Sequence, residues 1–380
     1  MRDRVGIILV LVTILFLSIP TVYAIDTIDV IETLDWSNLE SFFNNLPNEI
    51  KTLFDGDIKK YVTEFSQNSE SLNIENLKIF AFTYLYKALK KHISLFAVIL
   101  LIVVISSFFK TIKPDFASNS VGRIVDFSVA VIIGGLLSYS ILSFITSVST
   151  FLTTITSLIQ VIFPLIFTLL STVGATISTA SFQLSATIFA NVITTIIVSF
   201  ILPITVLTLV FSIISTIKSS SSQKISLFLA NFAKKMICAI FFIFSGFLAL
   251  QGVSVSVKDS VGVRLAKFSL SKYVPIIGGY LSDGFNYLFA GSVLLKNSIG
   301  ISFILLLLVL TLPLIVEVVT FHVLLKISSC VSDAVSENKV TKMLEGLSKC
   351  TSLIITSIIG VIVCLVIFAC ILILSCNSVL

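Results

Sequence analysis

Few residues of this chain have side chains that could do chemistry, and Glu317 is the most informative of them. It lies in an apolar run from Leu305 to Leu325, four residues after Pro313. A carboxylate in the middle of a bilayer costs about 2.5 kcal/mol or more, so a functional role is the first hypothesis for an intramembrane acid. Two interpretations fit Glu317: a polar clamp to another helix, or a position on a transport path.

Residues for catalysis, for metal binding and for nucleotide binding are missing from the sequence. The only histidines are His92 and His322. His322 follows Glu317 by five residues, which places it about 140° around a helix, so these two side chains are not a direct pair. No Gly-Lys-Ser/Thr motif and no metal-ligand spacing of the six cysteines occurs. We therefore expect no enzyme, no ATPase and no cofactor.

A polar stripe recurs every four residues before Pro203, at Gln183, Thr187, Asn191, Thr195 and Ser199. Side chains at this spacing lie along one slowly drifting line of a helix. Hydrogen bonding between membrane helices is the usual role of such a stripe, and the lining of a conduit is the sharper hypothesis. Gln160 and Pro164 repeat the combination of a polar residue and a kink.

The segment 272–300 contains several residues that interrupt helices. Pro275 followed by Gly278 and Gly279 predicts a broken, re-entrant or interfacial element, and Gly291 and Gly300 permit close approach of another backbone. We expect a hairpin here, across which Asp283 and Lys296 could pair.

These residues belong to an unusually apolar chain. Charged residues make up 12% of it and hydrophobic residues 56%, whereas a soluble domain has roughly 25% charged residues. From Ile124 to Ile217 the only formal charge is Asp126. About 20 apolar residues cross a bilayer as a helix. The sequence therefore predicts an all-α, polytopic membrane protein with about 6–8 spans.

The spans can be placed from the apolar runs. Ile93–Phe109 is the first, and the long block offers 125–147, 152–173 and 184–202, with 203–217 too short for another. Met236–Val257, Ser298–Leu325 and Ser352–Ser375 follow. Both ends of the block are basic, so the positive-inside rule demands an even number of crossings within it, two or four. Basic residues between Lys258 and Lys296 would then lie outside, which leaves the orientation of the C-terminal half open.

The N-terminus has the parts of a secretory signal over residues 1–24. Arg2 and Arg4 precede an apolar run that ends at Pro20, and Ala24 closes a small-x-small cleavage pattern. An uncleaved anchor is the alternative. Residues 25–92 then form a small, acidic, helical module outside the cytoplasm, and residues 93–380 form the membrane domain. The basic excess lies in the membrane domain, where Lys and Arg meet anionic lipid, and these scattered basic residues predict no nucleic-acid binding.

Three stretches of the C-terminal half resemble the stage III sporulation protein AE family. They are KYVPIIGGYLSDGF from Lys272, GSVLLKNSIG from Gly291, and LTLPLIVEVVTFHVLLKISSCVSDAV from Leu310. The resemblance implies a multi-pass protein of the mother-cell membrane around the engulfed forespore. It implies other stage III sporulation channel proteins as partners, including a secretion-type ATPase and ring-forming subunits. The family supplies no catalytic residues to transfer.

Three functions remain as hypotheses. The favoured one is a membrane-embedded, permease-like subunit of the channel between mother cell and forespore, which supports forespore gene expression after engulfment. A stand-alone secondary transporter would use Glu317 and the broken segment, although no inverted repeat is visible. A non-conducting scaffold for channel assembly would leave the polar membrane residues as contacts between helices.

Overall fold

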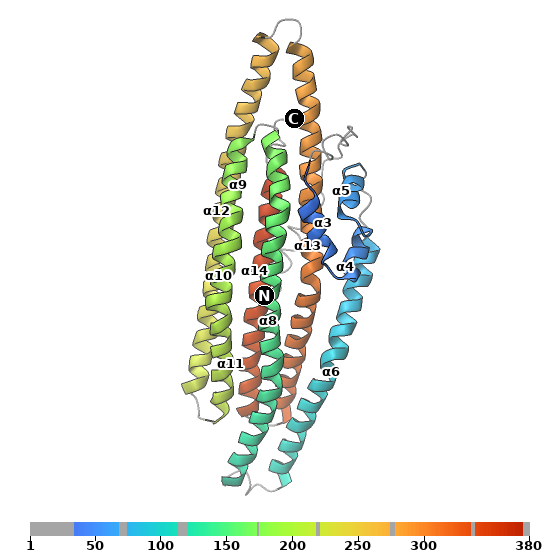
Figure 1. The fold of residues 1–380 in the computed structure, drawn as a ribbon. Helices are drawn as coiled ribbons and strands as arrows, with labels where there is room; N and C mark the ends of the chain where they lie inside the picture. The colour runs from blue at the N-terminus through green and yellow to red at the C-terminus, as the bar shows by residue number, and fades with distance from the viewer. Residues whose placement is uncertain are drawn as a thin grey trace.

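The fold is a bundle of long helices that run side by side (Figure 1). The computed structural model describes residues 34–67, 74–112, 120–172, 175–217, 221–273, 278–335 and 339–374. Within these ranges every regular element is helical and no strand occurs. The predicted all-α class is therefore confirmed, and the proposed signal at residues 1–24 lies outside the described ranges.

Six helices are long and apolar enough to cross a membrane in the part of the chain that the structure describes. The candidate spans are Glu75–Phe108, Phe127–Ser171, Thr179–Ser215, Ser222–Gly252, Gly291–Val335 and Val340–Leu374. They lie in α6 (Ile74–Ile112), α8 (Ser120–Thr172), the composite helix α9–α11, α12 (Ser221–Tyr273), α13 (Gly278–Val335) and α14 (Lys339–Leu374). A span of 45 residues is about 68 Å long, so it exceeds the roughly 30 Å hydrocarbon layer. The chain is a multi-pass membrane protein.

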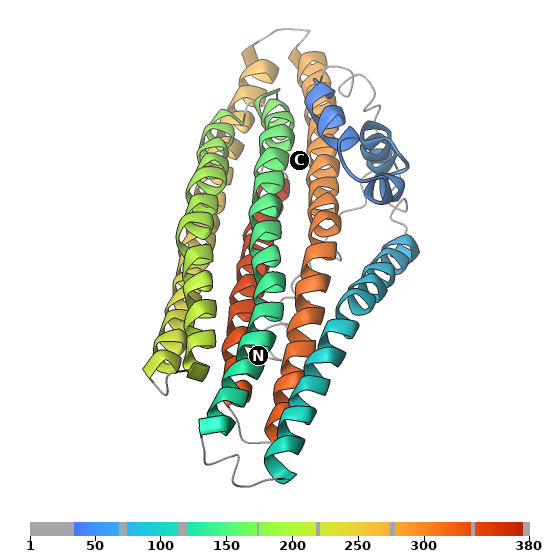
Figure 2. The same cartoon turned by 60° about the horizontal axis from the view of Figure 1, so that its bottom comes forward.

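The block from 124 to 217 contains two helices, and the span boundaries predicted inside it were wrong. α8 runs without a break through Pro164. The second helix passes from α9 (Thr176–Ile188) through the π-helix η3 (Phe189–Ile193), α10 (Thr194–Ile196) and the π-helix η4 (Ile197–Ile201) into α11 (Leu202–Ile217). Pro203 lies just after η4, where the wider π turn tolerates its missing N–H, so it does not end the helix. Two crossings agree with the even number expected for this block. The last turns of α6, α11 and α13 and the first turns of α8, α12 and α14 lie at the same end of the bundle (Figures 1 and 2).

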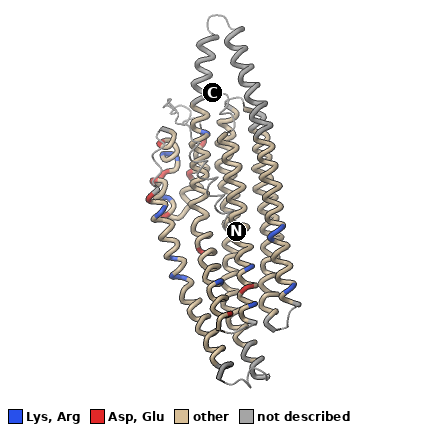
Figure 3. Tube along the Cα trace, turned by 180° about the vertical axis from the view of Figure 1, so that it is seen from behind, with Lys and Arg blue, Asp and Glu red and all other residues tan. Residues whose placement is uncertain are grey.

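The centre of the bundle is formed by α13 and α14, which pack on each other and on α8 and α12. Phe163 of α8, Phe303 of α13 and Phe368 of α14 meet there; the Phe163 and Phe368 rings are edge-on with centroids 4.8 Å apart. In the Cα trace of Figure 3, the Lys, Arg, Asp and Glu positions gather in the N-terminal module and in the lower part of the bundle, with a few on the helix that follows the module. Long stretches of helix between these regions carry none.

The N-terminal module consists of α3 (Ser37–Asn44), α4 (Asn48–Lys51), the 3₁₀ turn η1 (Thr52–Phe54) and α5 (Ile58–Gln67). The Asp57 carboxylate accepts hydrogen bonds from the Lys59 and Lys60 amides at 2.9 and 3.1 Å and so caps α5. Asp55 and Gly56 make the preceding turn with positive φ. α5 packs on α13 and α3 packs on α8. The module therefore lies against the membrane helices.

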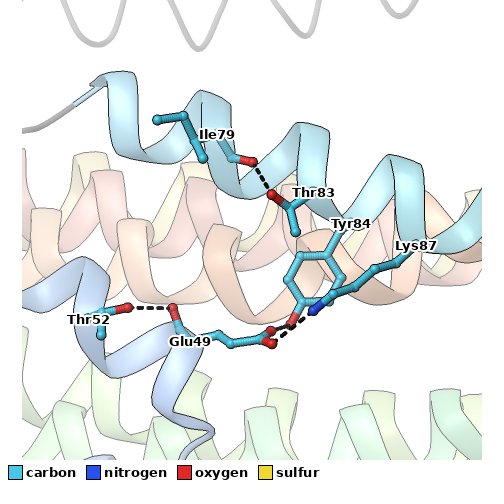
Figure 4. A network of polar contacts seen from close by, with 6 residues as sticks. All are labelled: Glu49, Thr52, Ile79, Thr83, Tyr84 and Lys87. Atoms are coloured by element: carbon cyan, nitrogen blue, oxygen red, sulfur yellow. Dashed lines mark hydrogen bonds and ion pairs between the residues drawn. The ribbon is translucent and has the colours of Figure 1, made fainter.

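A polar network also joins the module to α6 (Figure 4). Tyr84 donates a hydrogen bond to Glu49 Oε2 at 2.5 Å, and Lys87 Nζ lies 2.8 Å from Glu49 Oε1. Hydrogen bonds from Lys87 and then from Tyr84 hold the pKa of Glu49 below its ordinary value. α6 continues without interruption from this contact into its apolar half, which contains the expected first span Ile93–Phe109.

Candidate functional site

The outer face of α8 changes its chemistry between residues 142 and 143. Before that point its exposed large side chains are apolar and include Tyr139 at 80% and Leu142 at 44% exposure. From 143 to 171 every exposed residue is Ser, Thr, Gln or Pro: Ser143, Thr146, Ser147, Thr150, Thr153, Ser157, Gln160, Pro164, Thr168 and Ser171. This stretch is about 42 Å long, more than the hydrocarbon thickness of a bilayer.

A second polar row lies on the neighbouring helix and is the stripe predicted from the sequence. Gln183, Thr187, Asn191, Thr195 and Ser199 are all exposed. A four-residue repeat drifts by about 40° per step in a regular α-helix. The two π-helical turns η3 and η4 each hold more residues per turn, which takes up this drift and keeps the row in line. We refer to the exposed residues of 143–171 together with this row as the polar face.

The two rows meet in a groove of about 560 Å³. Thr156 and Thr194 bring the helices together with Oγ1 atoms 3.5 Å apart, and Ser171 donates to Thr179 at 3.4 Å. The groove thus brings together Gln160 and Pro164 of α8 and the stripe that begins at Gln183, which the sequence singled out separately. Its polar lining comes from Gln160, Thr168 and Ser171 on α8 and from Gln183, Thr187 and Asn191 opposite.

Hydrogen bonding divides the polar face into satisfied and unsatisfied groups. Four of its threonines, Thr146, Thr153, Thr168 and Thr187, bond within their own helices; Thr168, for example, donates to the Pro164 carbonyl at 2.9 Å. Asn191 Nδ2 likewise donates to the Thr187 carbonyl at 3.1 Å. Within the described ranges the side-chain amides of Gln160 and Gln183 have no such partner. Both amides line the groove and are exposed.

Further contacts between helices are made by buried serines outside the polar face. Ser185, one of them, donates to Gln251 of α12, whose Nε2 donates to the Ser181 carbonyl at 2.7 Å. Ser212 and Ser226 bond at 2.7 Å between α11 and α12. The stripe itself is exposed, so it does not hold together the helices of this chain.

Glu317 contacts α6. Lys91 Nζ lies 2.5 Å from Glu317 Oε1, and His92 Nε2 lies 3.4 Å from the same oxygen. His92 is 4% exposed, and its ring lies edge-on to Phe144 and Phe321, with centroids 5.9 and 5.3 Å away. His322 instead accepts or donates a hydrogen bond at 2.7 Å to Thr351 of α14. The geometry of Glu317 is that of a clamp between α6 and α13, and neither Lys91 nor His92 was assigned to it from the sequence.

The amino-acid sequence matches a family of known proteins over most of its length. The sequence profile described as stage III sporulation protein AE matches residues 56–376. The chain belongs to the stage III sporulation protein AE family. A curated member with that name, from Bacillus subtilis (strain 168), is 26% identical over 121 residues, which are 32% of this chain and 30% of that relative. No solved structure matches this chain.

The distinctive segment of this member of the family is helical where the structure describes it. Gly278 and Gly279 begin α13, their side-chain surroundings are not described, and Pro275 lies outside the described ranges. The predicted pairing of Asp283 with Lys296 was wrong, because both lie in the continuous helix α13, thirteen residues or about 20 Å apart. Residues 278–300 are the first turns of a long helix, so they do not form the re-entrant segment that was expected.

Two residues of that segment have defined structural roles. Lys296 is 2% exposed, and its Nζ donates to the Ile373 carbonyl at 3.0 Å in the last turn of α14. A cation there is favourable because the C-terminal carbonyls of a helix carry negative partial charge. At Gly300 a Cβ would lie 2.6 Å from Ile373 Cγ1, so the close neighbour of this glycine is a side chain of α14 and not the backbone that was expected.

The residues missed from the sequence are the serines and threonines of α8. Their signal was present, since 143, 146, 150, 153, 157, 160, 164, 168 and 171 are spaced by three or four. Among the residues that the structure describes, no three His, Cys, Asp or Glu side chains gather to hold a metal ion. The polar face is therefore the candidate functional site.

Proposed function

We propose that this chain is a membrane-embedded, permease-like subunit of the channel between mother cell and forespore, and that its polar face forms part of the conduit wall. The proposal places it in the mother-cell membrane around the forespore. Its partners would be other stage III sporulation proteins, including a secretion-type ATPase and ring-forming subunits, as the family resemblance suggests. Membership of the family supports the sporulation role.

The observation that carries the conduit is the composition of the α8 face, where no exposed residue from 143 to 171 is apolar apart from Pro164. Lipid is a poor solvent for this face, because an amide in hydrocarbon without a hydrogen bond costs several kcal/mol. Water, in contrast, donates and accepts the hydrogen bonds that the side chains of this face need. The exposed apolar side chains of α12, among them Phe242 at 80% and Leu250 at 75% exposure, show what a lipid-facing helix of the same chain looks like.

The contacts of Glu317 argue against a stand-alone transporter. Such a protein would need a carboxylate that is free to bind a proton or an ion near the centre of the membrane. Glu317 is already bound by Lys91 and is close to His92. A scaffold without a conduit would need no polar surface of this length.

The test is water accessibility along one helix. In a variant that lacks the six native cysteines, single cysteines replace Ser157 and Thr168 on the polar face, and Phe242 and the buried Leu158 as controls. Sporulating cells or their membranes are treated with charged, water-soluble thiosulfonates, which react with the thiolate. We expect labelling at Ser157→Cys and Thr168→Cys and none at Phe242→Cys or Leu158→Cys.

Function is read in the same strains. A bulky reagent on Ser157→Cys should reduce spore yield, because it fills the conduit, while the same reagent leaves the Phe242→Cys strain unchanged. If both polar-face cysteines resist labelling in assembled complexes, or if full modification leaves spore yield intact, this face does not line a conduit.

A further inference from the structure

The groove between α8 and α9–η3 is open along the outer side of the chain, so one copy cannot enclose a lumen. Its lining residues Gln160, Gln183 and Asn191 are all exposed. A conduit wall in a membrane must be closed against lipid all round its circumference. The missing part of the wall therefore belongs to another molecule, and the surface itself indicates which one. This step rests on the proposed function.

The side-chain amides in the groove can form hydrogen bonds with identical amides of a second copy. The amides of Gln160 and Gln183 have no hydrogen-bond partner within the described residues. A primary amide has two donors and an acceptor, so two identical amides can satisfy each other. Gln and Asn side chains drive the association of membrane helices in this way.

The surface offers no charge by which a different protein could recognise it. Between Asp126 and Lys218 the sequence has no Asp, Glu, Lys, Arg or His. Interfaces between different proteins gain specificity from complementary charges and from repulsion of wrong partners. This face can use neither, whereas pairing with its own copy needs only shape and hydrogen bonds.

Depth in the membrane also favours a second copy. Copies with the same orientation are related by an axis along the membrane normal, so every residue lies at the same depth as its equivalent. The polar face of one copy then meets the polar face of the other over its full length. On the outer edge of the stripe, Leu184, Val192 and Phe200 are 58%, 48% and 58% exposed and can pack as an apolar seal.

We propose that a second copy of this chain packs against the polar face, so that the grooves of two or more copies face one another and together enclose the conduit. The contact is between equivalent faces, polar in its middle and apolar at its edge. Lipid covers the exposed apolar residues of α12 and of the first half of α8.

The test is symmetric disulfide formation in the full-length protein in membranes. Single cysteines at Ser157 and Thr168, in the background without native cysteines, are oxidised with copper phenanthroline in cells that express two differently tagged copies. We expect covalent homodimers that contain both tags. Tyr139→Cys is the matched control, because it is 80% exposed on the apolar half of the same helix; it should cross-link at background level.

A second measurement does not depend on cysteine geometry. The double substitution Gln160→Leu/Gln183→Leu should reduce co-purification of the two tags by roughly tenfold, while Thr168→Val, whose hydroxyl is already bonded within its helix, should not. Thermal unfolding in detergent should be unchanged in Gln160→Leu/Gln183→Leu, since neither amide bonds to another described residue of the chain.

The outcomes separate this inference from the proposed function. Water-accessible cysteines without homodimers, or disulfides only to other proteins, overturn the self-contact and leave the conduit standing. If the cysteines form homodimers but are never labelled by water-soluble reagents, the contact between copies is supported and the proposed conduit is contradicted. Equal cross-linking at Tyr139→Cys overturns the assignment of the interface.

Discussion

At the scale of single residues, the clamp around Glu317 gives the sharpest prediction. We expect Glu317→Gln to accumulate and to support sporulation, because Gln keeps the shape and can still accept a hydrogen bond from Lys91. Glu317→Leu should weaken the packing of α6 on α13 by about 1–2 kcal/mol. Spore yield and membrane abundance, measured together for both variants, check this.

The ion pair itself is tested by a double-mutant cycle. Lys91→Met leaves the half-buried Glu317 carboxylate without its nearest cation, which costs more than removal of both charges. The double variant Lys91→Met/Glu317→Gln should therefore unfold at a higher temperature than Lys91→Met alone. Additive effects of the two substitutions would show that the pair is not coupled.

Glu49 predicts a pH dependence of the contact between the module and α6. Its pKa is lower in the folded protein than the ordinary glutamate value of about 4.3, owing to hydrogen bonds from Lys87 and Tyr84. The stabilisation that ionised Glu49 gives to the contact between the module and α6 is therefore fully present above a pH of about 4.3. It is lost as the pH falls through the lowered pKa of Glu49. The protection of α4 amides from hydrogen exchange, corrected for the intrinsic exchange rate at each pH, should fall on acidification, and Glu49→Gln should be less sensitive to pH. Glu64, which pairs only with Lys60 of its own helix, provides the control Glu64→Gln.

At the scale of elements, close packing of α12 on α14 predicts a cost for one added methyl group. A Cβ at Gly360 would overlap the ring of Phe241, whereas a Cβ at Gly246 of α12 meets nothing within 4 Å. Gly360→Ala should therefore destabilise the protein by about 1–3 kcal/mol, as overpacking does. Gly246→Ala should be neutral or slightly stabilising, because Ala is the better helix former. Thermal unfolding in detergent compares the two, and equal melting temperatures would contradict the close contact between Gly360 and Phe241.

Helix packing also explains why the predicted spans differed from the observed helices. Pro164 and Pro203 are strong helix breakers in water. In this bundle α8 continues through Pro164, and the π turn before Pro203 lets the second helix continue. Membrane helices tolerate proline because neighbouring groups and local π adjustments satisfy the freed carbonyl.

At the scale of the whole molecule, the six candidate spans among the described residues predict an alternating topology. A reporter fused after Glu70, Thr172 or Tyr273 should be active on one side of the membrane, which we expect to be the extracytoplasmic one. Reporters after Ile112, Ile217 or Val335 should be active only in the cytoplasm. A reporter at Thr172 that behaves like one at Ile112 would rule out two crossings in the long apolar block, and a reporter at Tyr273 decides the orientation of the C-terminal half.

The sequence by itself determined the class of this protein and most of its chemistry. A helix made of an uncharged apolar run can only face lipid or protein, so the all-α membrane bundle followed from composition and periodicity alone. The four-residue spacing of Gln183 and Asn191 also placed them on one line. Family resemblance came from the residues around Lys272 and Glu317.

The tertiary structure alone decided what the polar residues face. Spacing cannot separate a residue that joins two helices of one chain from a residue that faces away, because both need the same repeat. Ser185 and Ser212 proved buried and bonded between helices, while Gln160, Gln183 and the polar-face serines of α8 proved exposed. Likewise, Asp283 and Lys296 lost their expected contact because α13 is continuous, and Glu317 gained Lys91 from a helix 226 residues earlier. Burial and partners depend on which helices are neighbours, and that is fixed only when the whole bundle packs.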